Sequence, residues 1–331
     1  MIALVLEQFN HPFVLKEINR PIPGSGQVLV KIRASGVNPL DLKIKAGNAA
    51  HARTNVPAIL GIDMAGVVEE VGEDVQGFAP GDEVYGMTGG VGNVQGSLAE
   101  YAAVDAALLA PKPRNLTFRE AAAIPLSFIT AWEGLMDRAH AGAGKTVLVQ
   151  GGSGGVGHIA VQLAVAAGAT VYATDRSHKA PLIESYGATP IDFSRHTVEE
   201  YVKEYTDGEG FDIVFDSVGG GVLDDSFRAA KIHYGHVLSI LGWGTHSLAP
   251  LSFRGATYSG VFTLIPLLSG NGRPHHGKIL REATTIIEAG KLMPLMDPRH
   301  FNMDTVEDAY AALEGRTAKG KIVILCAPLF S

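Results

Sequence analysis

Three glycines, Gly152, Gly154 and Gly157, have the spacing G-x-G-x-x-G in a segment that reads QGGSGGVG. Glycines at this spacing let the backbone turn tightly and approach a phosphate group, and a helix that starts there supplies N–H groups and positive potential. The motif is weak alone, but a strand-like run precedes it and a helix-like run follows it. The pattern predicts a dinucleotide site, with a merely tight strand-to-helix turn as the alternative. The residues expected to bind the pyrophosphate are Gly151, Gly152, Ser153, Gly154, Gly155, Val156 and Gly157.

A second strand-like run after the loop, Thr170–Thr174, is followed by Asp175. A carboxylate at this place accepts hydrogen bonds from the adenosine ribose, which favours NAD. Arg176 and Lys179 follow at once, and their charges would neutralise a 2′-phosphate, which favours NADP. A solvated loop is the third interpretation, so the residues alone leave the choice of cofactor open.

Residues for other kinds of chemistry are scarce. The single cysteine, Cys326, cannot form a cysteine-cluster metal site, and so low a cysteine content is typical of a reducing compartment. The histidine pairs His275–His276 and His233–His236 lack a third ligand at a usual spacing, so we expect surface histidines and no metal. Ser153 lies in the glycine loop rather than in a nucleophile elbow. The chemistry must therefore rest on the cofactor, whose hydride adds most readily to an electron-poor carbon.

The composition is that of a globular protein with enough chain for two domains. Of 331 residues, 46% are hydrophobic and 18% charged, and the formal net charge is −7. The absence of a basic block argues against a nucleic-acid partner. The N-terminal MIALVLEQF has no basic leader and predicts an edge strand, and glycines interrupt the uncharged stretch 146–174, which predicts a buried βαβ unit rather than a membrane span. We expect a cytoplasmic protein.

The predicted secondary structure changes along the chain, from strands alone to alternating strands and helices. The first third alternates β-branched residues with Gly, Pro and Asp, which is typical of a compact all-β barrel or sandwich. Thr117 and Glu120 form a capping-box pattern that predicts the start of a helix. From Lys145 strands and helices alternate, as in a parallel doubly wound sheet. The C-terminal strand has no helix after it, so we expect it to return to the first domain.

The chain resembles the medium-chain dehydrogenase/reductases, specifically their zinc-independent quinone oxidoreductase branch. The matching segments are ASGVNPLDLKIKAG (34–47), GIDMAGVVEEVGEDV (61–75), F-x-P-GDEVYG (78–86), AAAIPLSFITAWEGL (121–135), the glycine loop, FDIVFDSVGG (211–220) and TAKGKIVIL (317–325). The resemblance implies an α/β protein with a GroES-like β-barrel domain (residues 1–122 and 277–331) and a Rossmann domain with a doubly wound parallel sheet (residues 123–276).

The resemblance also implies site residues. It places Asn38 and Asp41 at the cleft between the domains, with a turn residue and a helix cap as the competing interpretations, and Lys43 where many quinone reductases carry a substrate-facing tyrosine. Thr130 matches a threonine near the nicotinamide. Further cofactor-binding positions are Ser217, Val218, Leu241, Gly242, Phe262, Thr263 and Lys319. Zinc-dependent relatives hold ligands where this chain has Asn38 and the segment Gly61-Ile62-Asp63.

These expectations define the activity to be tested. The resemblance implies an NAD(P)H-dependent reductase that transfers a hydride to a small electrophilic substrate, a quinone or an α,β-unsaturated carbonyl, without zinc and with NADP(H) favoured over NAD(H). A relative of the zinc-type alcohol dehydrogenases and a non-catalytic dinucleotide-binding protein remain the alternatives. The family habit of pairing Rossmann sheets predicts a homodimer, with the apolar segment 256–268 as its seam.

Overall fold

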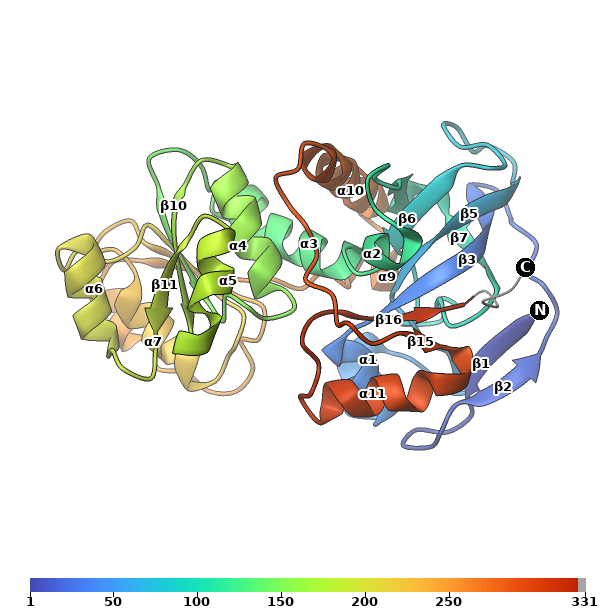
Figure 1. Ribbon diagram of the computed structural model, residues 1–331, viewed down its shortest axis with the longest axis horizontal. Coiled ribbons are helices and arrows are strands. Elements are labelled where there is room, and N and C mark those ends of the chain that lie inside the picture. Colours follow the sequence, from blue (N-terminus) through green and yellow to red (C-terminus); the bar gives the residue numbers. More distant parts are fainter. Residues whose placement is uncertain (327–331) are drawn as a thin grey trace. The chain divides into compact units, whose positions relative to one another are not determined.

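The computed structural model of the chain describes residues 1–326 (Figure 1). The chain forms two compact units, which are described separately below. The first contains residues 1–126, 264–290 and those from 294 onward, and the second contains Ser127–Thr263 and Lys291–Met293. The domain boundary expected after residue 276 falls inside a helix, α10 (Arg273–Glu288).

The first unit is built on a seven-stranded sheet in which six strands follow the order β15-β16-β3-β5-β6-β8 and β7 pairs with β3. The strands are β3 (Gln27–Val37), β5 (Asp63–Val71), β6 (Glu83–Met87), β7 (Tyr101–Asp105), β8 (Leu109–Pro111), β15 (Phe301–Asn302) and β16 (Ile322–Leu325). The pairing of Ile322 in β16 with Val37 in β3 is antiparallel and confirms that the C-terminal strand returns to this unit.

A second, three-stranded sheet of this unit has the order β2-β1-β4. Its strands are β1 (Ile2–Leu6), β2 (Val14–Glu17) and β4 (Ala58–Ile59). The expectation that the N-terminal strand is an edge strand is wrong, because β1 pairs with β2 on one side and β4 on the other. Four of its five residues are buried, which is the physical reason for its apolar sequence.

Alternate residues of β3 carry the core of the barrel. Val28, Val30 and Ile32 are at most 1% exposed and pack against Met64 and Val68 of β5. These three side chains share one face of β3, and Leu29 on the other face is fully buried as well, so the strand is covered on both sides there. The segment following Val37 leaves the sheet, so the residues after it are free to form a polar site at the strand end.

The helices of the first unit lie around these sheets (Figure 1). They are α1 (Pro39–Lys45), α2 (Phe118–Ala121), α9 (Ile265–Ser269), α10 and α11 (Val306–Glu314), with short 3-10 turns at Ala50–Ala52, Ala106–Leu108 and Met303–Thr305. Thr117 caps α2 by accepting from the Glu120 N–H, which confirms the predicted capping box. His275 and His276 lie in α10 rather than in a loop, and His276 is fully buried, so the expectation of surface histidines is wrong for it.

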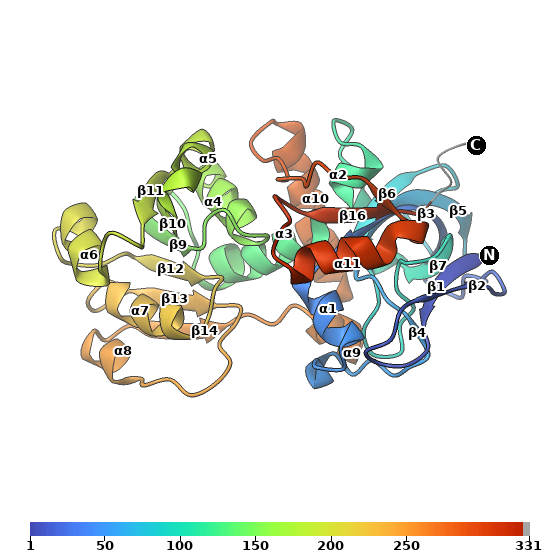
Figure 2. The ribbon, with the colours of Figure 1, turned by 60° about the horizontal axis from the view of Figure 1, so that its bottom comes forward.

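The second unit holds a six-stranded parallel sheet with the order β11-β10-β9-β12-β13-β14, of which Figure 2 shows β9, β12, β13 and β14 side by side. Its strands are β9 (Thr146–Gln150), β10 (Thr170–Asp175), β11 (Thr189–Asp192), β12 (Ile213–Asp216), β13 (His236–Ser239) and β14 (Thr257–Gly260). Numbered along the chain from β9, this is the order 3-2-1-4-5-6 of a Rossmann fold, with the switch point between β9 and β12.

The helices of the second unit alternate with these strands. They are α3 (Pro125–Trp132, whose first two residues belong to the first unit), α4 (Gly157–Ala166), α5 (Ala180–Ser185), α6 (Val198–Thr206), α7 (Gly221–Ala229) and α8 (Ala249–Phe253), with a π-helical stretch at Glu133–Arg138 and a 3-10 turn at Ser177–Lys179. The apolar segment 256–268 is only partly strand, because β14 ends at Gly260 and α9 begins at Ile265.

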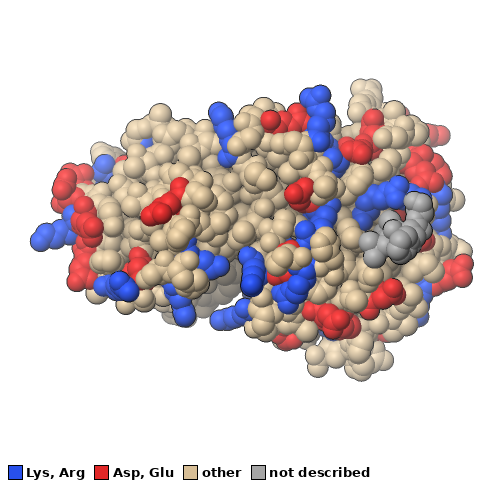
Figure 3. All heavy atoms as spheres, in the orientation of Figure 1, with Lys and Arg blue, Asp and Glu red and all other residues tan. Residues whose placement is uncertain are grey.

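Two surface features bear on possible partners. In Figure 3, acidic and basic side chains are interspersed on the face shown, with wide uncharged areas between them. That face therefore lacks the continuous basic stripe that usually marks a nucleic-acid site. None of the helices within residues 1–326 combines the length and apolar character needed to cross a membrane.

Candidate functional site: a dinucleotide loop and a buried polar cluster

The glycine loop joins β9 to α4 at the carboxyl end of the parallel sheet. A Cβ atom on Gly157 would lie 1.9 Å from the carbonyl oxygen of Gly151, so the turn requires glycine there. Among residues 1–326, no hydrogen-bond partner is present for the backbone N–H groups of Gly155 and Val156, which precede the first turn of α4. Such unpaired donors at a helix N-terminus fit the oxygens of a pyrophosphate.

Neighbouring side chains hold the loop in this shape. Asp175, at the end of β10, accepts from the N–H of Ser153 (3.0 Å) through one carboxylate oxygen and from the N–H of Arg176 (2.9 Å) through the other. A ring nitrogen of His158 lies 2.8 Å from the carbonyl oxygen of Gly154. The carboxylate of Asp175 is thus committed to the loop, a role that its position in the sequence did not reveal.

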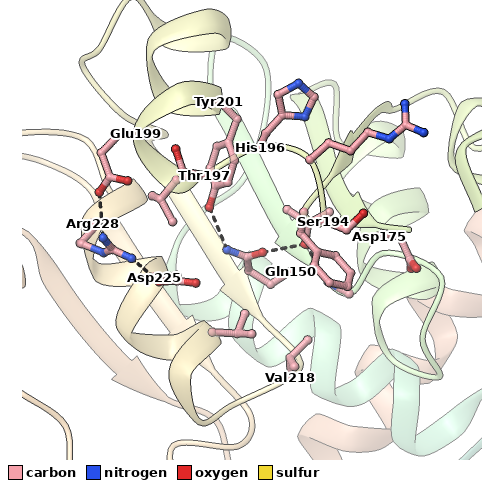
Figure 4. Close-up of a pocket in the computed structure, with 16 residues that line it drawn as sticks. Gln150, Asp175, Ser194, His196, Thr197, Glu199, Tyr201, Val218, Asp225 and Arg228 are labelled. Carbon is pink, nitrogen blue, oxygen red and sulfur yellow. Dashed lines mark hydrogen bonds and ion pairs between the residues drawn. The ribbon is translucent and has the colours of Figure 1, made fainter. Parts of the chain in front are cut away.

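A cavity of about 530 Å³ opens beside this loop. Its lining includes Gln150, Gly151, Asp175, Val218 and the segment 193–199, all from the second unit. Figure 4 shows the amide of Gln150 pointing toward the Tyr201 hydroxyl, at 3.4 Å. The cavity lies at the carboxyl ends of β9, β10 and β12, which is where open α/β sheets bind their ligands.

The basic side chains that line this cavity differ from those singled out in the sequence. Arg195, His196 and Arg228 belong to its lining, whereas Arg176 and Lys179 do not. Arg228 is paired with Glu199 and Asp225, as Figure 4 shows. Arg195 is largely exposed and has one carboxylate neighbour, Asp192, at 3.4 Å. The spacing of residues gave no signal for Arg195, because the loop after β11 reaches the cavity only in the folded unit.

Residues after β12 and β13 complete this side of the sheet. Asp216 is fully buried and accepts from the N–H groups of Val218 and Gly219, which fixes the loop after β12. Ser217 donates to the backbone oxygen of Gln150 (2.7 Å), and Gly219 lies against Leu241. The structure therefore brings Ser217 and Val218 together with the glycine loop. Of the other expected cofactor contacts, Gly242 is exposed, Phe262 is half-buried, and Thr263 and Thr130 are buried.

The first unit holds a cluster of four polar side chains that are almost wholly buried: Asn38, Asp41, Asp63 and Lys321, exposed by 1%, 0%, 0% and 5%. Lys321 donates to Oδ1 of Asn38, and Nδ2 of Asn38 donates to Oδ2 of Asp63 at 2.9 Å. The other oxygen of Asp63 accepts from the N–H of Leu126 at 2.9 Å. We call these four residues the polar cluster.

Local structure explains how two of these residues meet. Asn38 is the N-cap of α1, and its N–H donates to Oδ2 of Asp41 in the first turn at 2.8 Å. The structure therefore makes Asn38, rather than Asp41, the N-cap of α1, and Asp41 lies in the first turn of the helix. Oδ1 of Asp41 is buried and has no hydrogen-bond partner among residues 1–326. Lys321, at the start of β16, was missed by sequence reasoning, which chose Lys319; that lysine is exposed, and its N–H donates to Asp297.

Burial dominates the electrostatics of the polar cluster. It raises the pKa of Asp41 from 3.8 to about 7, although the N–H of Asn38 counteracts this. Burial also raises the pKa of Asp63 to about 6, against the charge of Lys321. The pKa of Lys321 is lowered by burial, and Asp63 and Asp41 oppose that effect. The cluster thus holds two carboxyl groups that titrate near neutral pH.

The remaining expected site residue, Lys43, is exposed on α1. Burial lowers the pKa of His51, and the positive charge of Lys43 lowers it further, so these two side chains are electrostatic neighbours. Within residues 1–326, no group of three or more His, Cys, Asp or Glu side chains has the arrangement of a metal site. The donors of the polar cluster are an amide, two carboxylates and an ammonium, which suit Zn²⁺ poorly because an ammonium repels a cation.

Known proteins match the chain along its length. A family model of the alcohol dehydrogenase GroES-like domain matches residues 24–114, and one of the zinc-binding dehydrogenases matches residues 186–324. A 2-methylene-furan-3-one reductase of Solanum lycopersicum is 38% identical over 94% of this chain and 75% of its own length. An NADPH-dependent alkenal/one oxidoreductase of Arabidopsis thaliana is 36% identical over 99% of this chain and 80% of its own length.

Solved structures are similar to this chain along its whole length as well. The crystal structure of an alcohol dehydrogenase superfamily protein from Novosphingobium aromaticivorans is 56% identical and superposes with a TM-score of 0.96 over 98% of this chain and 99% of that one. The fold, the glycine loop and these relatives together indicate an oxidoreductase of a dinucleotide-dependent class. The chain belongs to the medium-chain dehydrogenase/reductases, in their quinone oxidoreductase-like branch.

Proposed function

We propose that this protein transfers a hydride from NADPH to the β-carbon of an α,β-unsaturated carbonyl or to a quinone, without a catalytic metal. The observation that carries the proposal is the polar cluster, in which the ammonium of Lys321 is the cation beside Asn38 and Asp63. Relatives named as alkenal/one and 2-methylene-furan-3-one reductases support this substrate class.

The residues of the chain have two tasks in this reaction: they bind the cofactor, and they stabilise the charge that develops on the substrate. The glycine loop binds the pyrophosphate, and the bound dihydronicotinamide supplies the hydride. Negative charge then develops on the substrate oxygen, where hydrogen-bond donors such as Asn38 and Lys43 stabilise it by about 3 kcal/mol in a closed site. A conjugated acceptor needs no metal to ionise a hydroxyl group, since its oxygen is already a carbonyl.

The preference for NADPH is part of the same proposal. Asp175 uses both of its carboxylate oxygens on backbone N–H groups, so it is less available to a ribose hydroxyl. Arg195 and His196 line the cavity beside it and offer donors for a 2′-phosphate. The relative named as NADPH-dependent supports this choice.

We also propose a homodimer in the cytoplasm. The edge strand β14 has one neighbour in its sheet, β13, and its outer backbone groups are a template for pairing with a second copy. The single, buried thiol of Cys326 is typical of a reducing compartment. Light scattering at micromolar concentration tests the dimer, and a monomer would refute it.

The direct test of the function is an assay of NADPH oxidation with a panel of enones, quinones and ketones, before and after treatment with a chelator. We expect turnover with enones or quinones that the chelator leaves unchanged. Alcohol-dependent reduction of NADP⁺ that the chelator abolishes would instead establish the zinc-type alcohol dehydrogenase alternative. Tight NADPH binding without turnover on any acceptor would establish a non-catalytic dinucleotide-binding protein.

A further inference from the structure

The polar cluster contains a lysine, Lys321, that the sequence pattern did not single out and to which the proposed reaction gives no task of its own. Lys321 immediately precedes β16, and Asn38 comes from the segment between β3 and α1, 283 positions away in the chain. The antiparallel pairing of Ile322 with Val37 brings the two side chains together. Their contact is therefore a product of the strand that returns from the C-terminus.

The hydrogen bonds of this cluster determine which way the Asn38 amide points. An ammonium only donates and an ionised carboxylate only accepts. Lys321 therefore requires an oxygen at the end of the amide it contacts, and Asp63 requires the nitrogen at the other end. A reversed amide would oppose N–H groups to the ammonium and an oxygen to the carboxylate, so both contacts would become repulsive.

The charge of Lys321 also balances buried carboxyl groups. Asp41 and Asp63 are fully buried, and Lys321 is the cation whose charge lowers the pKa of both. Among residues 1–326, Tyr310 on α11 is a further titratable neighbour of Asp41, and burial raises the pKa of its hydroxyl well above its usual range. Removal of the ammonium would leave the carboxyl groups uncompensated, which changes what Asp63 offers to Asn38.

We propose that Lys321 is a positioning residue for the reaction: its ammonium fixes the amide of Asn38 with the oxygen toward the lysine and the nitrogen toward Asp63, and thereby sets Asn38 as a hydrogen-bond donor. This inference rests on the proposed function, because it assumes that Asn38 serves the substrate oxygen. Lys321 acts through Asn38 and need not touch the substrate.

A double-mutant cycle tests this coupling. The variants are Lys321→Met, which keeps the length and apolar stem but removes the charge, Asn38→Ala, and the two combined. If Lys321 acts through Asn38, each single variant lowers kcat about tenfold or more, and the double variant is within about threefold of Asn38→Ala alone. The KM for NADPH stays unchanged, because none of these hydrogen bonds reaches the glycine loop.

A second buried lysine provides the matched control. Lys112 is 7% exposed in the same unit, donates to the backbone oxygen of Pro113 at 3.0 Å and pairs with Glu83 at 3.1 Å, away from the polar cluster. Lys112→Met should lower the melting temperature but leave kcat per folded molecule unchanged. Unchanged kcat in Lys321→Met, or independent, multiplicative losses in the double variant, would overturn the proposal.

A measurement without turnover separates this inference from the proposed function. The side-chain amide protons of Asn38, observed by NMR, should shift strongly in Lys321→Met and stay in place in Lys112→Met. A wild-type protein inactive with every acceptor would overturn the proposed function alone if the amide signal still depends on Lys321. An amide signal that ignores Lys321 would overturn the positioning role, whatever the activity.

Discussion

The glycine loop of the second unit presents backbone N–H groups and allows close backbone contacts, whereas the polar cluster of the first unit consists of side chains that bind one another. In the loop, Gly157 is required because a Cβ atom would meet the Gly151 carbonyl oxygen. In the cluster, Lys321, Asn38 and Asp63 hold one another through buried hydrogen bonds. The difference indicates that the glycine loop depends on backbone geometry, while the polar cluster depends on particular charges.

The largest expected effect comes from placing a charge in the loop. Gly154 is exposed, and a Cβ atom there would lie 3.2 Å from the Gly151 oxygen, so the loop tolerates a side chain with a small adjustment. Gly154→Asp should weaken NADPH binding by about 100-fold or more, because its carboxylate repels the pyrophosphate at the helix N-terminus. Fluorescence titration measures the affinity, and circular dichroism checks that the fold persists.

Gly154→Ala is the matched control for this variant. It adds a methyl group without charge and should weaken binding far less than Gly154→Asp. Micromolar affinity in Gly154→Asp would show that the phosphates bind elsewhere, and the contrast between the two sites would then fail.

Asn38→Ala should lower kcat and leave NADPH affinity almost unchanged, whereas Gly154→Asp should lower the affinity. Removal of the amide deprives the substrate oxygen of a donor, so kcat should fall by about 10- to 100-fold. NADPH affinity should stay within about twofold of the wild type, because the amide belongs to the polar cluster and not to the loop. Steady-state kinetics and cofactor titration measure the two quantities. A loss of cofactor affinity as large as the loss of kcat would contradict the division of tasks.

We expect Arg195, rather than the glycine loop, to decide between NADPH and NADH. It lines the cavity beside Asp175, while Arg176 lies outside the lining. Arg195→Ala should weaken NADPH binding about tenfold and leave NADH binding unchanged, since the loss of one charged hydrogen bond to a phosphate is worth about 1.5 kcal/mol. Arg176→Ala serves as the comparison. If only Arg176→Ala changes the preference, the sequence-based choice of that arginine is right.

The sequence predicted the loop more completely than the polar cluster, of which it singled out Asn38 and Asp41 but not Lys321, and the reason is physical. Strand, loop and helix of the dinucleotide site are contiguous, so residues 146–166 contain nearly all the information about it. The pattern predicts a strand over Thr146–Gln150 and a helix over Gly155–Ala167, and the structure has β9 at Thr146–Gln150 and α4 at Gly157–Ala166. Both the GroES-like and Rossmann-type architectures were predicted as well. The contacts of Asn38 with Asp63 and Lys321, and the place of Arg195 beside the cavity, in contrast join separate segments of the chain, which no local pattern encodes.

The smallest expected effect concerns stability and pH. Because the folded-state pKa of Asp41, about 7, lies above its ordinary value of 3.8, the folded protein binds this proton more tightly than the unfolded chain. The contribution of Asp41 to the free energy of unfolding is therefore present at low pH and is lost as pH rises through about 7. Between about pH 6 and about pH 8 the free energy of unfolding should fall by roughly 1 kcal/mol on this account.

Asp41→Asn removes this titration. Its free energy of unfolding, measured by chemical denaturation, should decline less over the same range than that of the wild type. Identical pH dependence in both proteins would mean that Asp41 keeps an ordinary pKa and that the buried cluster is more polar than its hydrogen bonds indicate.

The position of the transferred hydride tests the central claim most directly. The protein would be incubated with NADPH deuterated at C4 of the nicotinamide and with a simple enone, and the product examined by NMR. The account predicts deuterium on the β-carbon of a saturated ketone, with a second hydrogen from solvent on the α-carbon, and no effect of a chelator on the yield. Deuterium on the carbonyl carbon of an allylic alcohol would contradict it, because the protein would then reduce carbonyl groups as alcohol dehydrogenases do.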